Sequence, residues 1–464
     1  IMETNKDQKG KLSKWAKNSI TSRMLMVGIL ILILMIPLSY IEMLIQERMM
    51  RQQDVVGEIN QKWGDEVLIY GPILKVPYKV FTTKSTYEDK TKTWLKEEIE
   101  STKYAFFFPE KLDIISTINP EEKTRGIYKT AVYQSEIIIN GSFEKPDFSE
   151  KEIKDEHILW DKIKLIVQTT NLKGANSLFA ININKNSYPF SSSHFNDDYN
   201  TNNYNAQNDV SLNELESKTL QLIDVPKEKT TTFSMNINMK GSKQIQFIPI
   251  GKETDVNVKS DWKTANFIGE YLPYNSDKIT EEGFNAKWKI LDINRPYSQQ
   301  FFKGIPNLKR FAFGVNFMIP VDEYQKSERS AKYGFLVIGL TFLVFFLIQT
   351  MSKIQIHPFQ YLMIGVALTM FYTLLISISE HSSFLKAYLI AGFAVISLIT
   401  LYSKSILKNI KFPVFIGISL TALYTFIFVI IQLENYALLV GSIGLFAILA
   451  GVMFASRKID WENN

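Results

Sequence analysis

Residues 333–352 read YGFLVIGLTFLVFFLIQTMS, a stretch without a single charged side chain. A helix of about 20 apolar residues crosses a hydrocarbon core of about 30 Å, and a helix satisfies its own backbone polar groups there. This stretch therefore predicts a membrane-spanning helix. The same signature, with no Lys, Arg, Asp or Glu, recurs in Met24–Ile41, Ile354–Ser379, Ala387–Ser403, Phe412–Leu433 and Asn435–Ser456.

The order of these segments divides the chain into a membrane part and a polar part. One segment lies near the N-terminus and five crowd the last third, so the hydrophobic content of 46% averages two different kinds of sequence. We expect an α + β membrane protein with six transmembrane helices, one before and five after a large β-rich domain. Its parts are an N-terminal basic tail (1–23), the first helix (24–41), the large domain (42–332), a five-helix bundle (333–456) and a C-terminal tail (457–464).

The basic residues predict the orientation, because Lys and Arg in short connections mark the cytoplasmic side. Only Lys386 lies in the short loops of the opposite side. With the N-terminus inside, the cytoplasmic connections hold Lys6, Lys9, Lys11, Lys14, Lys17, Arg23, Lys353, Lys404, Lys408, Lys411, Arg457 and Lys458. Both termini are therefore expected in the cytoplasm and the large domain in the periplasm. The first segment is interpreted as a retained signal anchor, since it exceeds a usual h-region and no small-x-small cleavage site follows it.

Composition excludes several classes of function. The chain has no cysteine, which excludes disulfides, thiol catalysis and cysteine-ligated metals. Its net charge of +5 is mostly explained by the cytoplasmic flanks, which favours contact with anionic membrane lipids rather than nucleic acid. None of the four histidines belongs to a His-Glu-x-x-His motif, and no nucleotide or dinucleotide fingerprint is present, so we expect neither cofactor nor metal.

The domain between the first two membrane segments is predicted to be rich in β-strands. From Phe233 to Lys240, apolar and polar side chains alternate with period two, as in a half-buried strand. Similar runs are Tyr104–Phe108, Ala131–Ile139, Ile163–Val167, Ile181–Ile183, Ile245–Ile248, Val256–Val258 and Phe311–Ile319. Together they predict one or two sandwich-like units. Residues 42–60 and 322–332 favour helix and are expected to form rigid stems beside the membrane helices.

Two further patterns bear on this domain. Gly141-Ser142 and Gly241-Ser242 each end an apolar run, and each is followed by a Trp beside an Asp, at Trp160 and at Trp262. This spacing is consistent either with two copies of a β-unit or with chance. Residues Asn186–Asp209, crowded with Asn, Ser, Asp and Tyr, are predicted to be a loop.

The candidate functional residues lie at the outer end of the third membrane segment. Glu380 and His381 follow Ser379 directly, and ionisable groups at the edge of a bilayer either end a helix in water or belong to a functional site. A weaker alternative is Ser383 with Lys386, a Ser-x-x-Lys pattern in the same loop without companion motifs. It would imply a hydrolase with a Ser-Lys dyad.

Several stretches resemble the CreD family, a bacterial inner-membrane family linked to cell envelope integrity. They include Trp63-Gly64, Gly71–Tyr78, Pro320–Tyr324, Arg329–Gly334, His357–Tyr361 and Phe371–His381. The resemblance covers nearly the whole chain. It implies a Gram-negative inner-membrane protein connected with envelope stress, β-lactam response and colicin tolerance, and it implies no established reaction.

These observations favour a protein that acts in envelope maintenance by binding or scaffolding rather than by catalysis. Its expected partners are membrane lipids and an envelope or membrane protein. One alternative is a protein that handles lipids or cell-wall precursors, with a cavity opening laterally near Glu380 and His381. The other is an envelope hydrolase that uses Ser383 and Lys386.

The orientation can be tested with reporters that are active on only one side of the membrane. Fusions after Asn200, Ser383, Asn409 and Asn464 are expected to report outside, outside, inside and inside, because each position is separated from the next by a set number of crossings. A cytoplasmic signal at Asn200 would contradict the whole layout, since every later position alternates from it.

Overall fold

The computed structural model describes residues 20–88, 93–170, 172–192, 212–317, 323–352, 354–407, 409–433 and 436–457. The chain forms two compact units. One contains the residues up to Asp54 together with those after Pro320, and the other is Val55–Pro320. The first is called the bundle and the second the β-domain.

The helices are α2 (Ile20–Trp63), α3 (Glu323–Lys332), α4 (Gly334–Ser352), α5 (Pro358–Ser379), α6 (Phe384–Ile406), α7 (Lys411–Gln432) and α8 (Ala437–Ser456). All of these except α3 are long and apolar enough to cross a membrane, which confirms the six predicted transmembrane helices. Helix α2 continues without a break through residues 42–60, and α3 covers most of 322–332. That these two segments act as stems stays a prediction.

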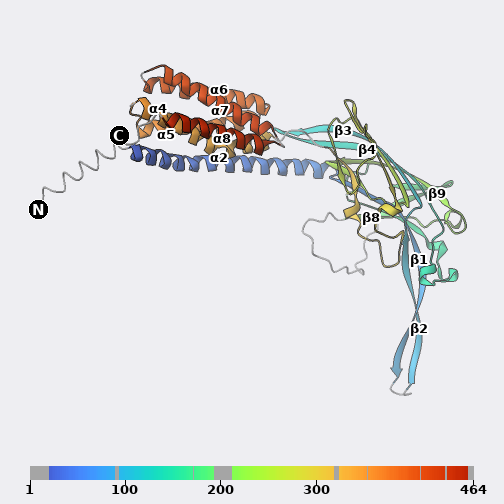
Figure 1. The fold of residues 1–464 in the computed structure, drawn as a ribbon. Coiled ribbons are helices and arrows are strands. Elements are labelled where there is room, and N and C mark those ends of the chain that lie inside the picture. The colour runs from blue at the N-terminus through green and yellow to red at the C-terminus, as the bar shows by residue number, and fades with distance from the viewer. Residues whose placement is uncertain are drawn as a thin grey trace. The chain divides into compact units, whose positions relative to one another are not determined.

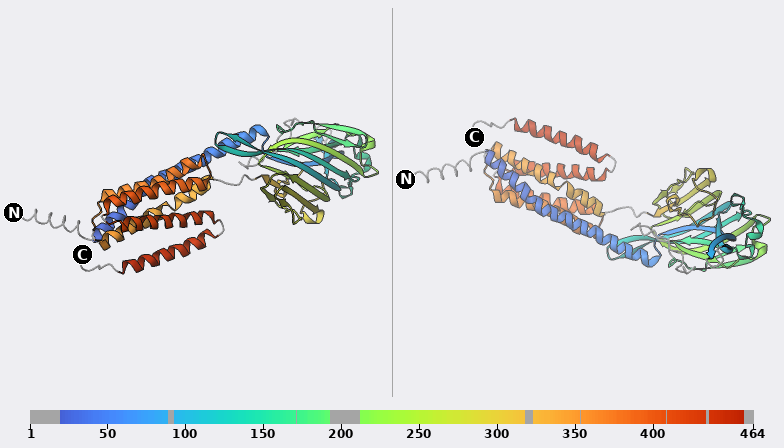
Figure 2. Two further views of the ribbon diagram at one scale, coloured as in Figure 1. Left: turned by 90° about the horizontal axis from the view of Figure 1, so that it is seen from above. Right: turned by 90° about the horizontal axis from the view of Figure 1, so that it is seen from below.

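Polar side chains within the bundle bond mostly to backbone or to a neighbouring helix. Helix α5 begins with a capping box, in which the imidazole of His357 accepts the Phe359 N–H and Gln360 accepts the His357 N–H. The buried Tyr361 hydroxyl of α5 donates to Gln349 of α4 at 2.8 Å. Such bonds hold helices together where lipid offers no hydrophobic driving force. Figure 2 shows the helices side by side, with α8 at one edge next to α7.

The β-domain is built on one continuous sheet. Its strands are β1 (Val67–Glu88), β2 (Thr93–Phe107), β3 (Lys111–Arg125), β4 (Tyr128–Phe143), β5 (Lys164–Thr169), β6 (Ala180–Ile183), β7 (Asn186–Ser192), β8 (Asn213–Ser217), β9 (Thr231–Ser242), β10 (Gln244–Phe247), β11 (Glu253–Ser260), β12 (Ala265–Gly269), β13 (Ile279–Thr280), β14 (Gly283–Leu291), β15 (Gln300–Phe301) and β16 (Phe313–Phe317). The order is β12-β16-β10-β1-β5-β8-β7-β6-β9-β4-β3-β11-β14-β13, while β2 pairs with β1 and with β15. Each predicted run overlaps one of these strands.

This sheet is nearly closed around a single apolar core. Its two ends face each other through aromatic rings: Phe267 of β12 contacts Trp288 of β14 at 5.9 Å between ring centroids, and Trp288 contacts Phe313 of β16 at 5.4 Å. Buried residues from both halves of the sheet form one continuous cluster. The sequence was consistent with one or two β-units in this domain, and the structure has one.

The two strands that suggested a repeat are neighbours in this sheet. Strands β4 and β9 pair antiparallel with Ile137 opposite Ile237. Each glycine then lies opposite an aromatic residue: a Cβ on Gly241 would come within 2.4 Å of the Tyr133 ring, and one on Gly141 within 2.5 Å of the Phe233 ring. The match does not extend to the tryptophans, because one precedes β5 and the other follows β11. These are paired strands with related packing, not two copies of a unit.

The predicted loop at Asn186–Asp209 is wrong in its first part. Asn186–Ser192 forms strand β7, which joins the two halves of the sheet by pairing with β6 and β8. The buried side chains of Tyr188 and Phe190 supply the alternation that the surrounding polar residues obscured. The remainder of the predicted loop, residues 193–209, lies outside the described residues.

Strands β1 and β2 continue beyond the body of the β-domain as a two-stranded ribbon, seen plainly in Figure 1. Strand pairing of β1 with the body ends with its bridge from Tyr78 to Ile158, and that of β2 begins where it meets β15 at Phe106. The last side-chain contacts of β1 with the body are those of Val80 with the core and of the Phe81 ring with His157, at 5.1 Å between ring centroids. Between these points the Lys79–Thr102 to Glu88–Thr93 pairs join the two strands only to each other, within the described part of the chain. This segment is called the ribbon.

Replacing Gly241 with Ala is expected to destabilise the β-domain by about 1–3 kcal/mol, because the new methyl group would displace the fully buried Tyr133 ring. The measurement is protease resistance of the full-length protein in detergent as a function of urea concentration. Gly57→Ala is the matched control: nothing lies within 4 Å of its Cβ position in α2, and Ala favours helix by about 1 kcal/mol. Equal resistance of Gly241→Ala and wild type would contradict the packing described for β4 and β9.

Candidate functional site

Glu380 follows the last residue of α5 and is the centre of a polar cluster at this end of the bundle. Its side chain is 16% exposed and forms an ion pair with Arg48 of α2, with 3.5 Å between Nε and Oε1. The same oxygen accepts a hydrogen bond of 3.4 Å from the hydroxyl of the buried Tyr324 of α3. One carboxylate thus connects three helices.

A second carboxylate connects α3 to α6. Glu323 accepts the backbone N–H of Phe384, the first residue of α6, at 2.8 Å. The first amides of a helix lack partners within the helix and favour a negative charge nearby. Ser383 occupies the N-cap position but its side chain makes no capping bond, so Glu323 performs that task from another helix. Arg48, Glu323, Tyr324 and Glu380 are together called the Glu380 cluster.

The cluster positions helices more than it stabilises them. The Arg48 side chain is 45% exposed, and an exposed ion pair contributes roughly 0–1 kcal/mol. The hydrogen bond that Tyr324 donates to Glu380 and the one that Glu323 accepts from Phe384 involve partly buried groups. They fix the orientation of the joined helices as well as the distance between them. Helices α2 and α3 connect the bundle to the β-domain in sequence. Both therefore contact the end of α5, and α3 also contacts the start of α6.

The other predicted residues do not join this cluster. His381 is exposed, and its backbone N–H bonds to Ile378 while Glu380 bonds to α2 and α3. Ser383 and Lys386 are both exposed, and within the described residues no hydrogen bond joins them. No site role was predicted for Arg48, Glu323 and Tyr324, because they lie in segments that were expected to form helical stems. Nothing in the local sequence indicates that Arg48 meets the end of α5.

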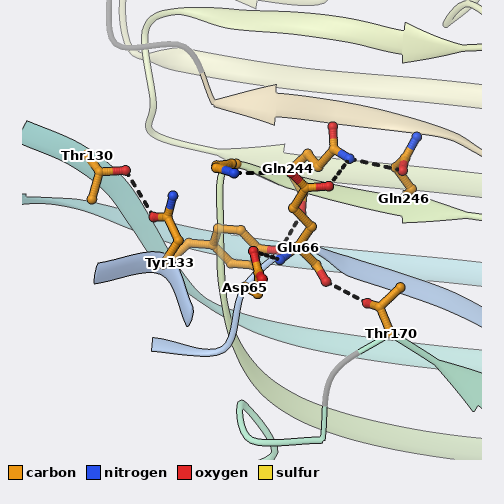
Figure 3. Close-up of polar contacts among 9 residues, drawn as sticks. Asp65, Glu66, Thr130, Tyr133, Thr170, Gln244 and Gln246 are labelled. Atoms are coloured by element: carbon orange, nitrogen blue, oxygen red, sulfur yellow. Dashed lines mark hydrogen bonds and ion pairs between the residues drawn. The ribbon is translucent and has the colours of Figure 1, made fainter. Parts of the chain in front are cut away.

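A second polar cluster surrounds the point where α2 passes into β1. Figure 3 shows Glu66 between Gln244 and Thr170: its carboxylate accepts from the Gln244 amide at 2.7 Å, and its carbonyl accepts from the Thr170 hydroxyl at 2.5 Å. Lys243 lies 3.5 Å from the other carboxylate oxygen. The fully buried Tyr133 donates to the Gln244 carbonyl, and burial, with the charges of Glu66 and Asp65, raises the pKa of its hydroxyl well above the ordinary value.

Contacts of Trp63 and Gly64 also fix the turn between α2 and β1. The Trp63 indole donates to the Tyr133 carbonyl at 3.2 Å, and the Lys240 ammonium lies 5.2 Å from its ring. Gly64 has φ 138°, and a Cβ there would lie 2.6 Å from the Lys240 carbonyl oxygen. Only glycine fits such a position without strain. The Trp63-Gly64 pair noted in the sequence therefore marks the turn from helix to sheet.

The bundle also contains an apolar cavity of about 340 Å³ between α4, α7 and α8. Its lining includes Thr341, Leu423 and Ile448, and neither Glu380 nor His381 belongs to it. The cavity therefore differs in place from the one that the lipid-handling alternative required. Across the described residues, no group of three or more His, Asp or Glu side chains is arranged to hold a metal ion.

Comparison with known proteins identifies a family. The family model described as "Inner membrane protein CreD" matches residues 19–462. The Inner membrane protein CreD of Escherichia coli (strain K12) is 27% identical over 440 residues, which cover 93% of this chain and 91% of that relative. Because the family match spans both the bundle and the β-domain, this chain belongs to the CreD family of inner membrane proteins.

Proposed function

We propose that this protein maintains the cell envelope by binding another envelope component through its β-domain, without catalysing a reaction. In this proposal both termini lie in the cytoplasm and the β-domain lies in the periplasm, the orientation that the basic connections favour. Membership of an inner membrane family supports the location. The observation that carries the proposal is the ribbon.

The ribbon has features that favour binding to another chain. A two-stranded hairpin is marginally stable in water, and exposed strand edges are templates for pairing with another chain. The ribbon also presents apolar side chains to solvent, since Phe81 is 42%, Trp94 64% and Ile99 41% exposed. A strand from a partner would pair with one free edge of the ribbon and cover part of this apolar surface.

The expected partner is an extended segment of an envelope or membrane protein that adds a strand to the ribbon. Charges on the ribbon are largely balanced within it: Lys79 pairs with Glu100 at 2.9 Å, and Lys84 lies opposite Glu97. Recognition would therefore rest on backbone hydrogen bonds and on apolar contacts rather than on net charge.

The direction of the backbone groups identifies the positions that would bind. Pro77 of β1 accepts from Leu159 on the side away from β2, and in an antiparallel pair this direction alternates along the strand. Thr83, at even spacing from Pro77, therefore points its N–H outward. Glu98, which lies opposite Thr83, points its own N–H outward at the other edge.

Shortening the ribbon tests the proposal. Residues 81–100 are replaced by Asn-Gly, so that the opposed Val80 and Ser101 are joined by a two-residue hairpin turn. The variant is expected to accumulate at wild-type level and to lose protection, measured as β-lactam survival and colicin tolerance in cells lacking the native copy. Full protection by the shortened protein would overturn the proposal.

A subtler change asks whether the edges themselves bind. Thr83→Pro combined with Glu98→Pro removes one outward N–H from each edge and leaves the β1–β2 ladder intact. We expect this variant to protect less than the matched Thr83→Ala, Glu98→Ala variant at equal abundance. Equal protection by both would show that the added strand is not the mode of binding.

The choice between binding and hydrolysis is tested at the end of the bundle. Glu380→Gln combined with His381→Ala is expected to reduce protection more than Ser383→Ala, because loss of the carboxylate charge weakens the contacts to Arg48 and Tyr324. Both variants are compared at equal membrane abundance. Full protection by the double variant together with loss of protection in Ser383→Ala would favour the hydrolase.

A further inference from the structure

The cavity between α4, α7 and α8 lies along the middle of these helices. Its walls include Thr341 and Val344 of α4, Ser419 and Leu423 of α7, and Gly444 and Ile448 of α8. Its volume of about 340 Å³ falls in the range of small-molecule sites, roughly 300–1,000 Å³. Helices that cross a bilayer place such a middle zone at the depth of the hydrocarbon.

The chemistry of the walls selects the kind of occupant. Thr341 already donates its hydroxyl to the Val337 carbonyl at 2.7 Å, and the rest of the lining is almost wholly aliphatic or aromatic. Besides Thr341 only Ser419 contributes a hydroxyl, so the walls are poor in the two to four polar partners that a buried water needs. No charged side chain lines the cavity, so nothing there would hold a headgroup. The fitting occupant is a hydrocarbon chain.

Helix α8, which forms one wall of the cavity, packs loosely against the rest of the bundle. None of the residues in the apolar window of α8 is buried, and α8 lies at the edge of the bundle beside α7 (Figure 2). Its close approach to α7 is at Gly444, where a Cβ would lie 2.1 Å from the Phe426 ring. Both of these residues line the cavity. The ring thus lies between the two backbones, beside the open space.

We propose that one acyl chain of a membrane phospholipid occupies this cavity as a bound lipid. An empty cavity loses the dispersion contacts of its lining, and a chain that is already in hydrocarbon enters without leaving water. Ala422, which lines the cavity and is exposed at the surface of α7, offers a side from which the chain can enter. Binding selects the chain and not the headgroup, and it does not depend on the function proposed for the ribbon.

The test measures lipid retained by the full-length protein after purification in mild detergent, by native mass spectrometry and by extraction. Wild type is expected to retain phospholipid at an equimolar ratio, with the headgroup composition of the membrane. Ser419→Phe and Ala422→Phe fill the cavity and should lower the retained amount severalfold. Ile418→Phe is the matched control, since Ile418 is on the same helix, 64% exposed and outside the lining.

A second measurement uses a phospholipid with a photoreactive group at the end of its acyl chain. Crosslinks are expected in the lining residues of α4, α7 and α8 in wild type and in Ile418→Phe, and not in the filled variants. Equal retention by wild type and both filled variants would overturn the proposal. So would a retained polyprenyl phosphate in place of phospholipid, or lipid-free wild type without crosslinks in the lining.

Discussion

A peptide group that finds no hydrogen-bond partner in hydrocarbon costs several kcal/mol, and this constraint orders the whole chain. Every described strand lies between Val67 and Phe317, and a helix covers most of each of the six apolar segments. Hydroxyl groups inside the bundle mostly bond back to their own helix, as Thr341 does to Val337 and Ser403 to Ile399. The polar unit is free of that constraint, and there the chain builds a sheet whose strand edges reach solvent.

The charged groups of the Glu380 cluster lie where the chain passes, in sequence, between the bundle and the β-domain. Glu323 caps α6, whereas Glu380 receives Arg48 and Tyr324, so the two carboxylates perform different tasks within one small region. Both tasks concern the placement of helices. His381, the next residue in sequence, is exposed at this end of the bundle.

The sequence predicted many elements where periodicity was strong, although it missed β14, in which Phe284, Ala286, Trp288 and Ile290 alternate with polar residues, and it failed where pairing is distant. The charge-free segments gave all six long helices, and the alternation at Phe233–Lys240 gave β9. Strand β1 was not predicted as a strand, because Val67–Leu74 is buried on both faces and shows no alternation. Its neighbours β10 and β5 come from far along the chain. For the same reason Glu380 was recognised by its type and position, while its partner Arg48 was not.

The order of strands in the sheet has a consequence for biogenesis. Strand β1 is the first to be synthesised, yet it pairs in parallel with β10, and β3 pairs in parallel with β11. Pairs of such high sequence separation form slowly, and unpaired strand edges are prone to aggregate while they wait. The sheet cannot be completed until β16 has been made, immediately before the chain returns to helix at α3. The nascent β-domain must therefore spend most of its synthesis with open edges, and its folding is coupled in time to the insertion of the helices that follow.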